Sequence, residues 1–296
     1  MLTEKCFSPS TVNEAVELLS RYGTEMKICA GGTDLFVMMR KGKTAARYLL
    51  NLSELDLSYV RKNEDNSLAI GAMMTLNHLQ TQPLLNNEPF FALLKAADHV
   101  GSLQIRNMAT VVGNICTGIS SADVSVPLLA LDAQVHAVSA KGSRFIPLSE
   151  FFIGPRQLAI TPNELITELI LPAPTKERYF SYFRKVGTRK ELLISTLNIA
   201  GILHLDAEGI VDELRLAMGV VAPFPVRLFE TEKALLGKSL TSETLDGAEA
   251  ALRGEIHPRS SHHGSKEYRT LLAVNLLRRL LADANESFEG KGVNRQ

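Results

Sequence analysis

The chain has 296 residues, of which 45% are hydrophobic and 22% are charged, an ordinary balance for a soluble globular protein. Its 32 basic and 32 acidic residues cancel, so no net field directs it to nucleic acid or to an anionic membrane. No apolar run reaches the roughly 18–20 residues of a membrane span, and the first residues lack the pattern of a signal peptide. Three widely spaced cysteines predict no disulfide framework and no metal or iron–sulfur site, so we expect a cytoplasmic protein.

The first predicted part, residues 1–55, alternates helices and strands. Residues 11–23 predict a helix, because Thr11 and Glu14 form a capping box and Gly23 can adopt the left-handed conformation that ends it. The elements expected next are a strand at 26–30, a short helix at 34–39 and a strand at 47–52.

The second predicted part, residues 56–175, is richer in strands. The elements expected are a strand at 67–74, a helix in the second half of 83–102, a hairpin at 132–148 that turns at Lys141-Gly142, and a strand at 164–172. Pro172 and Pro174 then indicate a linker.

The third predicted part, residues 176–296, places strands before helices. The strands are expected at 197–206 and 209–220, and the helices at 226–236, 241–253 and 265–283. This order is typical of an α+β domain, and no internal repeat interrupts it.

A glycine loop in "KICAGGTDL" stands between the strand at 26–30 and the helix that follows. Consecutive N–H groups in such a loop can form an anion-binding nest, and Thr33 adds a hydroxyl group. Asp34 is expected to cap the helix with its side chain, since a carboxylate pointing inward would repel a phosphate. The loop matches neither the Rossmann nor the P-loop pattern, and an ordinary strand–turn–helix junction explains it equally well.

A second stretch, "QIRNMATVVGNICTGISSAD", is rich in small and hydroxyl residues. Thr110, Asn114 and Thr117 offer hydrogen-bonding groups, and Asp123 could accept bonds from ribose hydroxyls. Two loops suited to phosphate and sugar, far apart in sequence, predict a dinucleotide that lies across two subdomains.

These two stretches resemble the FAD-binding signatures of the flavoprotein subunits of molybdenum hydroxylases, whose usual forms are AGGT-D/S-L and IRN-x-x-T-x-GGN. The resemblance covers nearly the whole chain, and the most similar branch is the FAD-binding (medium) subunit of bacterial xanthine dehydrogenases. Two positions depart from the family: Val112 replaces the first glycine of GGN, and Leu193 stands where many relatives carry aspartate. Further family-like segments are "LAIGAMMTLNHL", "FRKVGTRKELLIST" and "HPRSSHHGSKEYRTLLAVNLLRRL".

The resemblance implies a two-subdomain FAD-binding fold of the vanillyl-alcohol-oxidase (PCMH) type, at residues 1–55 and 56–175. An α+β domain like the C-terminal domain of carbon monoxide dehydrogenase flavoproteins would follow at 176–296. FAD would be bound non-covalently, with Asp123 on the ribose, Ile166 as an apolar contact to the flavin and Lys185 as a cation that stabilises reduced flavin. The other residues that the resemblance assigns to FAD are Lys27, Ile28, Cys29, Ala30, Gly31, Gly32, Thr33, Asp34 and Leu35, which wrap the pyrophosphate or adjoin that loop, and Ala109, Thr110, Gly113, Asn114 and Thr117.

The function implied is electron transfer within an oxidoreductase, a xanthine dehydrogenase-like molybdenum hydroxylase. Electrons would come from [2Fe-2S] clusters on a small partner subunit and pass through FAD to NAD. A large partner subunit would carry molybdopterin, in a dimer of heterotrimers, and xanthine is the substrate that the most similar branch suggests. No side chain of this chain is expected to act as a catalytic acid, base or nucleophile, or to bind a metal.

Two other functions remain open: a stand-alone FAD-dependent oxidase of the same fold, acting on a small alcohol or sugar, and a scaffold subunit that has lost FAD. Individual residues also have ordinary structural interpretations. Lys185 could be a surface lysine, Thr75 is expected to be a helix N-cap, and Cys29 and Cys116 are expected to be buried packing residues. The histidines at 257, 262 and 263 fit a solvated loop better than a metal site.

Overall fold

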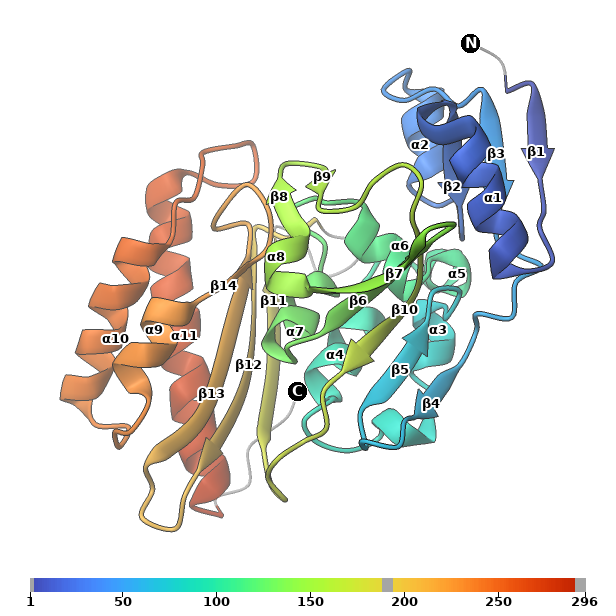
Figure 1. Cartoon of the computed structure of the whole chain (residues 1–296). Helices are drawn as coiled ribbons and strands as arrows, with labels where there is room; N and C mark the ends of the chain where they lie inside the picture. The colour runs from blue at the N-terminus through green and yellow to red at the C-terminus, as the bar shows by residue number, and fades with distance from the viewer. Residues whose placement is uncertain (1–2, 188–193, 291–296) are drawn as a thin grey trace. The chain divides into compact units, whose positions relative to one another are not determined.

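The computed structural model describes residues 3–187 and 194–290 and divides into two compact units (Figure 1). The first unit is made of Met1–Leu84, Val100–Gly118 and Asp132–Ala173, and the second of Leu85–His99, Ile119–Leu131 and Pro174–Gln296. Leu193 and the middle of "FRKVGTRKELLIST" lie outside the described residues. The division into three parts at residues 55 and 175 stays a prediction.

A small parallel sheet in the first unit carries the chain into the glycine loop. Its order is β1-β3-β2, with β1 at Lys5–Phe7, β3 at Tyr48–Asn51 and β2 at Met26–Cys29. The helix predicted at 11–23 is confirmed as α1 (Val12–Tyr22), whose N-cap Thr11 accepts a bond from the Glu14 N–H at 3.2 Å. α2 (Leu35–Arg40) follows the glycine loop. β1 was not predicted, because three largely exposed residues carry no periodic signal.

An antiparallel sheet with the order β4-β5-β10-β6-β7 forms the rest of the first unit's framework. Its strands are β4 (Val60–Lys62), β5 (Leu68–Gly71), β10 (Leu165–Leu171), β6 (Gln134–Ser139) and β7 (Gly142–Pro147). The hairpin predicted at 132–148 is confirmed by β6 and β7. The strand predicted at 67–74 is shorter than expected, since the chain turns after Gly71 towards α3 (Leu76–Leu79).

Short elements complete the first unit. They are the 3₁₀ turn η1 (Gly23–Glu25), α5 (Leu103–Met108), α6 (Val111–Cys116), α8 (Leu148–Phe151), β8 (Phe152–Gly154) and β9 (Gln157–Leu158), with the 3₁₀ turn η2 (Pro83–Leu85) at its boundary. α5 and α6 have six residues each, too few for a clear helical period, and the sequence did not predict them.

The second unit is a four-stranded antiparallel sheet between helices (Figure 1). Its elements are β11 (Phe180–Val186), β12 (Leu197–Leu205), β13 (Val211–Gly219), β14 (Val226–Arg227), α4 (Phe91–Asp98), α7 (Ser125–Ala130), α9 (Phe229–Leu235), α10 (Ser242–Glu255) and α11 (Lys266–Phe288). Figure 1 shows α9, α10 and α11 on one side of the sheet and α4 and α7 on the other. β12 is therefore buried almost along its whole length. The helix predicted at 226–236 begins late, because its first residues form β14.

Among the described residues, no helix is both long enough and apolar enough to cross a membrane. The core of the second unit instead forms where α11 packs on β12. Leu280 is fully buried there, and one of its methyl carbons lies 2.6 Å from the position that a Cβ at Gly201 would take. The leucine thus fills the space that the glycine leaves open.

We predict that Leu280→Ala lowers the free energy of unfolding by about 3 kcal/mol, because it opens a cavity between α11 and β12. Leu271→Ala is the matched control on the same helix, since Leu271 is 54% exposed and its loss should stay below about 1 kcal/mol. Urea unfolding of the full chain measures both values. Equal losses would show that the packing of α11 on β12 does not limit stability.

A pH-dependent ion pair joins β7 to the residue before β10. Arg144 Nε donates to Glu164 Oε1 at 2.6 Å, and the Thr161 N–H donates to the same carboxylate at 2.7 Å. These bonds lower the pKa of Glu164 from 4.5 to about 2, and the bond from Arg144 has the largest effect. The pair therefore stabilises the fold above pH 4.5, and this stability is lost as the pH falls through about 2.

We predict that Arg144→Gln destabilises the chain by about 1 kcal/mol at about pH 7, a modest value because Arg144 is half exposed. The difference from the wild type should shrink as the pH falls from about 4.5 to about 2, because the unfolded chains take up a proton at Glu164 near the ordinary pKa whereas the folded wild type takes it up only near pH 2. Urea midpoints at about pH 7 and about pH 3 measure it. A loss that does not change with pH would assign the effect to packing of the arginine stem instead.

Candidate cofactor site

The glycine loop joins β2 to α2 in the first unit. The N–H groups of Gly31, Gly32, Thr33 and Asp34 donate to no backbone carbonyl in the described part of the chain. Gly32 has a φ of 70°, in the left-handed region that favours glycine. Consecutive free N–H groups around such a residue form an anion-binding concavity. The loop thus has the geometry expected for binding a phosphate.

The expectation that the Asp34 side chain caps α2 is wrong. Asp34 stands at the N-cap position, but its side chain accepts no capping hydrogen bond. Its backbone is already helical, with φ −96° and ψ −44°, whereas a capping side chain needs an extended backbone to reach the helix N–H groups. Its carboxylate instead lies 3.5 Å from the Arg156 guanidinium.

The second predicted loop is held by residues 74–76. The Leu76 N–H donates to the Ala109 carbonyl and the Val111 N–H donates to the Met74 carbonyl, both at 2.9 Å. Between these bonds Thr75 and Thr110 form an isolated β-bridge. Thr75 is also the N-cap of α3, as predicted, and accepts from the His78 N–H. The segment that carries Ala109 and Thr110 is therefore fixed by backbone bonds on both sides.

Local hydrogen bonds use the hydroxyl groups of this second loop but leave one amide oxygen free. Thr110 Oγ1 accepts from the Gly113 N–H at 2.9 Å, and Thr117 Oγ1 donates to the Asn114 carbonyl at 2.8 Å. Asn114 Oδ1 is buried without a partner in the described residues. An orphaned buried acceptor costs free energy unless a water or a ligand satisfies it. Val112, the departure from the family pattern, is buried.

The two loops meet at Gly31. A Cβ at this position would lie 1.7 Å from the Met108 carbonyl oxygen, at the end of α5. Arg156, in the turn between β8 and β9, also reaches both loops: its Nη1 donates to the Thr117 carbonyl at 3.4 Å and lies near Asp34. Sequence reasoning missed Arg156, since nothing in "GPRQL" indicates what the turn adjoins.

A β-bulge in β10 orients Ile166. Ile166 pairs with Ala137 and Leu169 with Val135, whereas the pairing shifts by one residue between Ile166 and Glu168. Because Ala137 and Val135 lie two residues apart on β6, Ile166 and Leu169 share one face of the sheet. Without the extra residue, Ile166 would face the opposite side.

A polar cluster on the other face surrounds the bulge. Glu168 accepts a bond from Tyr59 Oη at 2.6 Å and pairs with Arg61 at 2.8 Å. Both Thr167 Oγ1 and Glu168 Oε1 lie 3.3 Å from His136 Nδ1. Burial, with help from Glu168, raises the pKa of Tyr59 to about 12, so it remains a donor. The cluster fixes the bulge through side chains that the sequence did not single out.

Asp123 and Lys185, both in the second unit, bind each other. Lys185 Nζ donates to Asp123 Oδ2 at 2.6 Å and to the His99 carbonyl at 3.0 Å, and both side chains are almost fully buried. Asp123 Oδ1 accepts two more bonds, from Ser195 Oγ at 2.6 Å and from Asn198 Nδ2 at 2.7 Å. Lys185 is therefore a buried partner of Asp123 rather than a surface lysine.

The remaining predicted residues have ordinary places. Cys29 is buried, as expected, but Cys116 is exposed, because α6 buries Val111 and Ile115 on its other face. Among the described residues, no group of three or more histidine, cysteine, aspartate or glutamate side chains could hold a metal ion. Lys27 and Ile28 lie on β2, Leu35 opens α2, Gly113 and Asn114 lie on α6, and Thr117 follows it.

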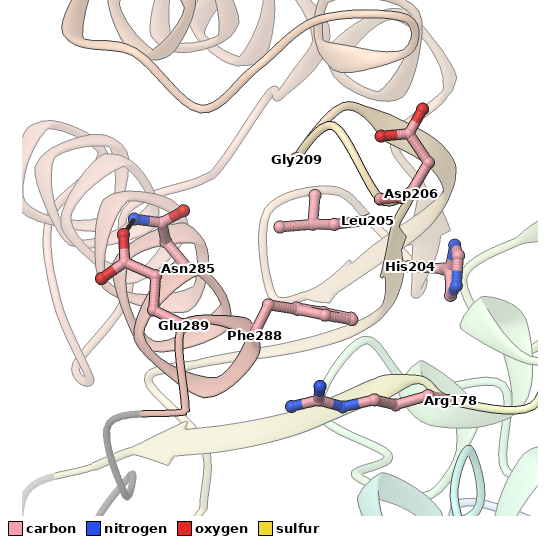
Figure 2. Close-up of a pocket in the computed structure, with 9 residues that line it drawn as sticks. Arg178, His204, Leu205, Asp206, Gly209, Asn285, Phe288 and Glu289 are labelled. Carbon is pink, nitrogen blue, oxygen red and sulfur yellow. Dashed lines mark hydrogen bonds between the residues drawn. The ribbon is translucent and has the colours of Figure 1, made fainter.

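A pocket of about 500 Å³ in the second unit contains none of the predicted residues (Figure 2). It lies between the β12–β13 turn and the end of α11. Its polar groups already have partners: Arg178 donates to the Ser287 carbonyl, Asp206 accepts from the Ile210 N–H, and Asn285 bonds to Glu289. The pocket thus offers a ligand few uncommitted groups, and the glycine loop of the first unit is the better candidate.

Comparison with known families identifies both halves of the chain. The family described as "FAD binding domain in molybdopterin dehydrogenase" matches residues 2–174. The family described as "CO dehydrogenase flavoprotein C-terminal domain" matches residues 181–284. The chain is thus an α+β flavoprotein with an FAD-binding domain and this C-terminal domain. It belongs, as an FAD-binding subunit of an oxidoreductase, to the molybdenum hydroxylase family.

Individual relatives agree over nearly the full length. The chain is 32% identical to a xanthine dehydrogenase FAD-binding subunit from Escherichia coli O157:H7, over 95% of this chain and 96% of that one. It is 30% identical to a nicotinate dehydrogenase FAD-subunit from Eubacterium barkeri, over 96% and 97%. A solved chain of carbon monoxide dehydrogenase from Hydrogenophaga pseudoflava has the same fold, with a TM-score of 0.90 and 28% identity over 96% and 97%.

We predict that Gly31→Ala weakens FAD binding at least about tenfold, because the new methyl group would collide with the Met108 carbonyl and separate the two loops. Gly247→Ala, in α10, is the control, since a Cβ there meets nothing within 4 Å. Fluorescence titration with FAD and thermal unfolding measure affinity and stability separately. Wild-type affinity in Gly31→Ala would mean that FAD does not depend on this close approach.

Proposed function

We propose that the glycine loop binds the pyrophosphate of FAD through the N–H groups of residues 31–34. The run of uncommitted N–H groups and the left-handed Gly32 support this assignment. Thr33 adds a hydroxyl donor, and Ile28, which is partly exposed on β2, offers an apolar surface beside the loop. In this proposal residues 27–35 make the first contact surface for the cofactor.

The second loop is proposed to line the cofactor as well, with Ala109, Thr110, Gly113, Asn114 and Thr117. The orphaned Asn114 Oδ1 supports it, because a hydroxyl or N–H group of FAD would give that oxygen the donor it lacks. Ile166, turned by the bulge to the apolar face of β10, is proposed to contact the flavin.

Asp123 and Lys185 are proposed to act on the cofactor as a pair. A lysine has three N–H donors, of which Lys185 uses two. A carboxylate offers about four acceptor sites, of which Asp123 uses three. Among the described residues, one donor on Lys185 and one acceptor site on Asp123 are thus left without a partner, and these are proposed to bind a flavin oxygen and a ribose hydroxyl.

The subunit is proposed to collect electrons from [2Fe-2S] clusters on a small partner and to deliver them to NAD, in a cytoplasmic dimer of heterotrimers whose large subunit carries molybdopterin. Bound FAD would supply the chemistry that joins one-electron donors to a two-electron acceptor. The chain's own residues hold and orient the cofactor and need no acid, base or nucleophile. Relatives are named for several substrates, among them xanthine, nicotinate and glyceraldehyde, and of these we favour xanthine.

We predict that NADH bleaches the flavin of the purified, FAD-loaded chain under anaerobic conditions, at about one equivalent of NADH per FAD. This ratio follows because NADH and FAD each exchange two electrons. Flavin absorbance follows the titration, and chemical reduction of a parallel sample gives the total flavin.

Other outcomes redirect the proposal. A yellow chain that NADH cannot reduce would exclude NAD and favour another acceptor or the stand-alone oxidase of the same fold. Co-purification with iron–sulfur and molybdenum subunits separates those two cases. A colourless chain that does not rebind added FAD would overturn the proposed function.

A further inference from the structure

Arg156 lies in a strained turn that is fixed beside the second loop. It has a φ of 56°, a left-handed conformation that is unfavourable for a residue with a side chain. Its N–H donates to the Gly118 carbonyl at 2.9 Å. A Cβ at Gly118 would lie 2.8 Å from the Arg156 Cα, so the two backbones are in direct contact. Glycine would adopt this turn with less strain, and strained residues of this kind cluster at functional sites.

The Arg156 guanidinium is weakly held and has donors to spare. Nη1 makes two long contacts, 3.4 Å to the Thr117 carbonyl and 3.5 Å to Asp34 Oδ2. Nε and Nη2 donate to no acceptor among the described residues, and the side chain is 45% exposed. A half-exposed ion pair of this length contributes little stability, so the contacts do not explain why an arginine occupies a strained position.

A cation beside the glycine loop would reduce the repulsion between the Asp34 carboxylate and a bound diphosphate. Asp34 belongs to the loop itself, and its carboxylate would repel a diphosphate bound to the neighbouring N–H groups. Arg156, whose guanidinium lies 3.5 Å from the Asp34 carboxylate, offsets that charge. A planar guanidinium with free N–H groups also matches the geometry of phosphate oxygens, on which it can form paired hydrogen bonds.

We propose that Arg156 is a further cofactor-binding residue, whose guanidinium contacts the pyrophosphate of FAD at the glycine loop. The proposal rests on the proposed function, and it adds a residue that the family resemblance does not assign to the cofactor. Arg156 thus connects the two loops through the ligand as well as through its own contacts with Asp34 and Thr117.

Arg156→Gly separates binding from folding, because glycine removes the guanidinium and relieves the strained backbone together. The dissociation constant for FAD should rise about tenfold, while the urea midpoint should stay the same or increase. Arg156→Lys keeps the charge but loses the planar fork, so its FAD affinity should lie between those of the wild type and Arg156→Gly. Arg144→Gln is the control, since it removes an arginine of similar exposure, 49%, in the same unit. Its FAD affinity should stay within about twofold of the wild type.

Salt dependence gives a readout that a structural role would not change. Fluorescence titrations of the full chain between about 0.05 and about 0.5 M salt should show FAD affinity falling with salt, and falling less steeply in Arg156→Gly than in the wild type or Arg144→Gln. Wild-type FAD affinity and salt slope in Arg156→Gly would overturn the proposal. So would a loss of affinity that accompanies a lower urea midpoint with an unchanged salt slope, because Arg156 would then only brace the turn. A wild-type chain that binds no FAD would instead overturn the proposed function itself.

Discussion

The close approach of Gly31 to the Met108 carbonyl is the constraint on which the candidate site depends. It leaves no room for a side chain at position 31, and it sets the separation between the glycine loop and the end of α5. Backbone hydrogen bonds from neighbouring segments hold both the glycine loop and the segment that follows α5. The Leu52 N–H donates to the Cys29 carbonyl at the end of β2, and residues 74–76 hold Ala109 and Val111 by backbone bonds. The two loops carry few side-chain contacts of their own, so the two sheets determine their positions.

Periodic elements of the fold could be predicted from the sequence, and short ones could not. α1, α10 and α11 each span enough residues to show an apolar stripe between caps, and the β6–β7 hairpin has an alternating pattern around a glycine turn. α5 and α6 are shorter than two full turns, so their apolar residues fit strand, helix or loop equally well. The only local signals were their N-caps, Ser102 and Thr110, whose hydroxyl oxygens each accept a hydrogen bond from the backbone N–H of the residue three positions later.

The residues of the candidate site also fall into two groups: those that a local sequence pattern indicates and those that only tertiary contacts position. The glycine loop could be found because glycine pairs after an apolar strand are a local pattern with a physical meaning. The bulge that turns Ile166 has no such pattern, since it depends on how β10 pairs with β6. Arg156 comes close to the two loops because of where the β8–β9 turn lies in the fold, and no sequence pattern indicates this position. The bond between Lys185 and Asp123 joins residues that lie 62 positions apart in the sequence. Sequence reasoning could propose Asp123 and Lys185 from the family pattern but could not predict that they are each other's partner.

That pairing changes what Lys185 can do. A buried ammonium 2.6 Å from a carboxylate presents a dipole to its surroundings, and the field of a dipole falls off faster than that of a lone charge. Ser195 and Asn198 hold Asp123 from its other oxygen, so the carboxylate is fixed independently of the lysine. If a flavin lies against Lys185, as the family resemblance implies, it meets one directed N–H donor with only part of a positive charge behind it. The ribose contact assigned to Asp123 and the cationic role assigned to Lys185 are then two ends of one electrostatic unit, and neither residue can be changed without altering what the other offers to the cofactor.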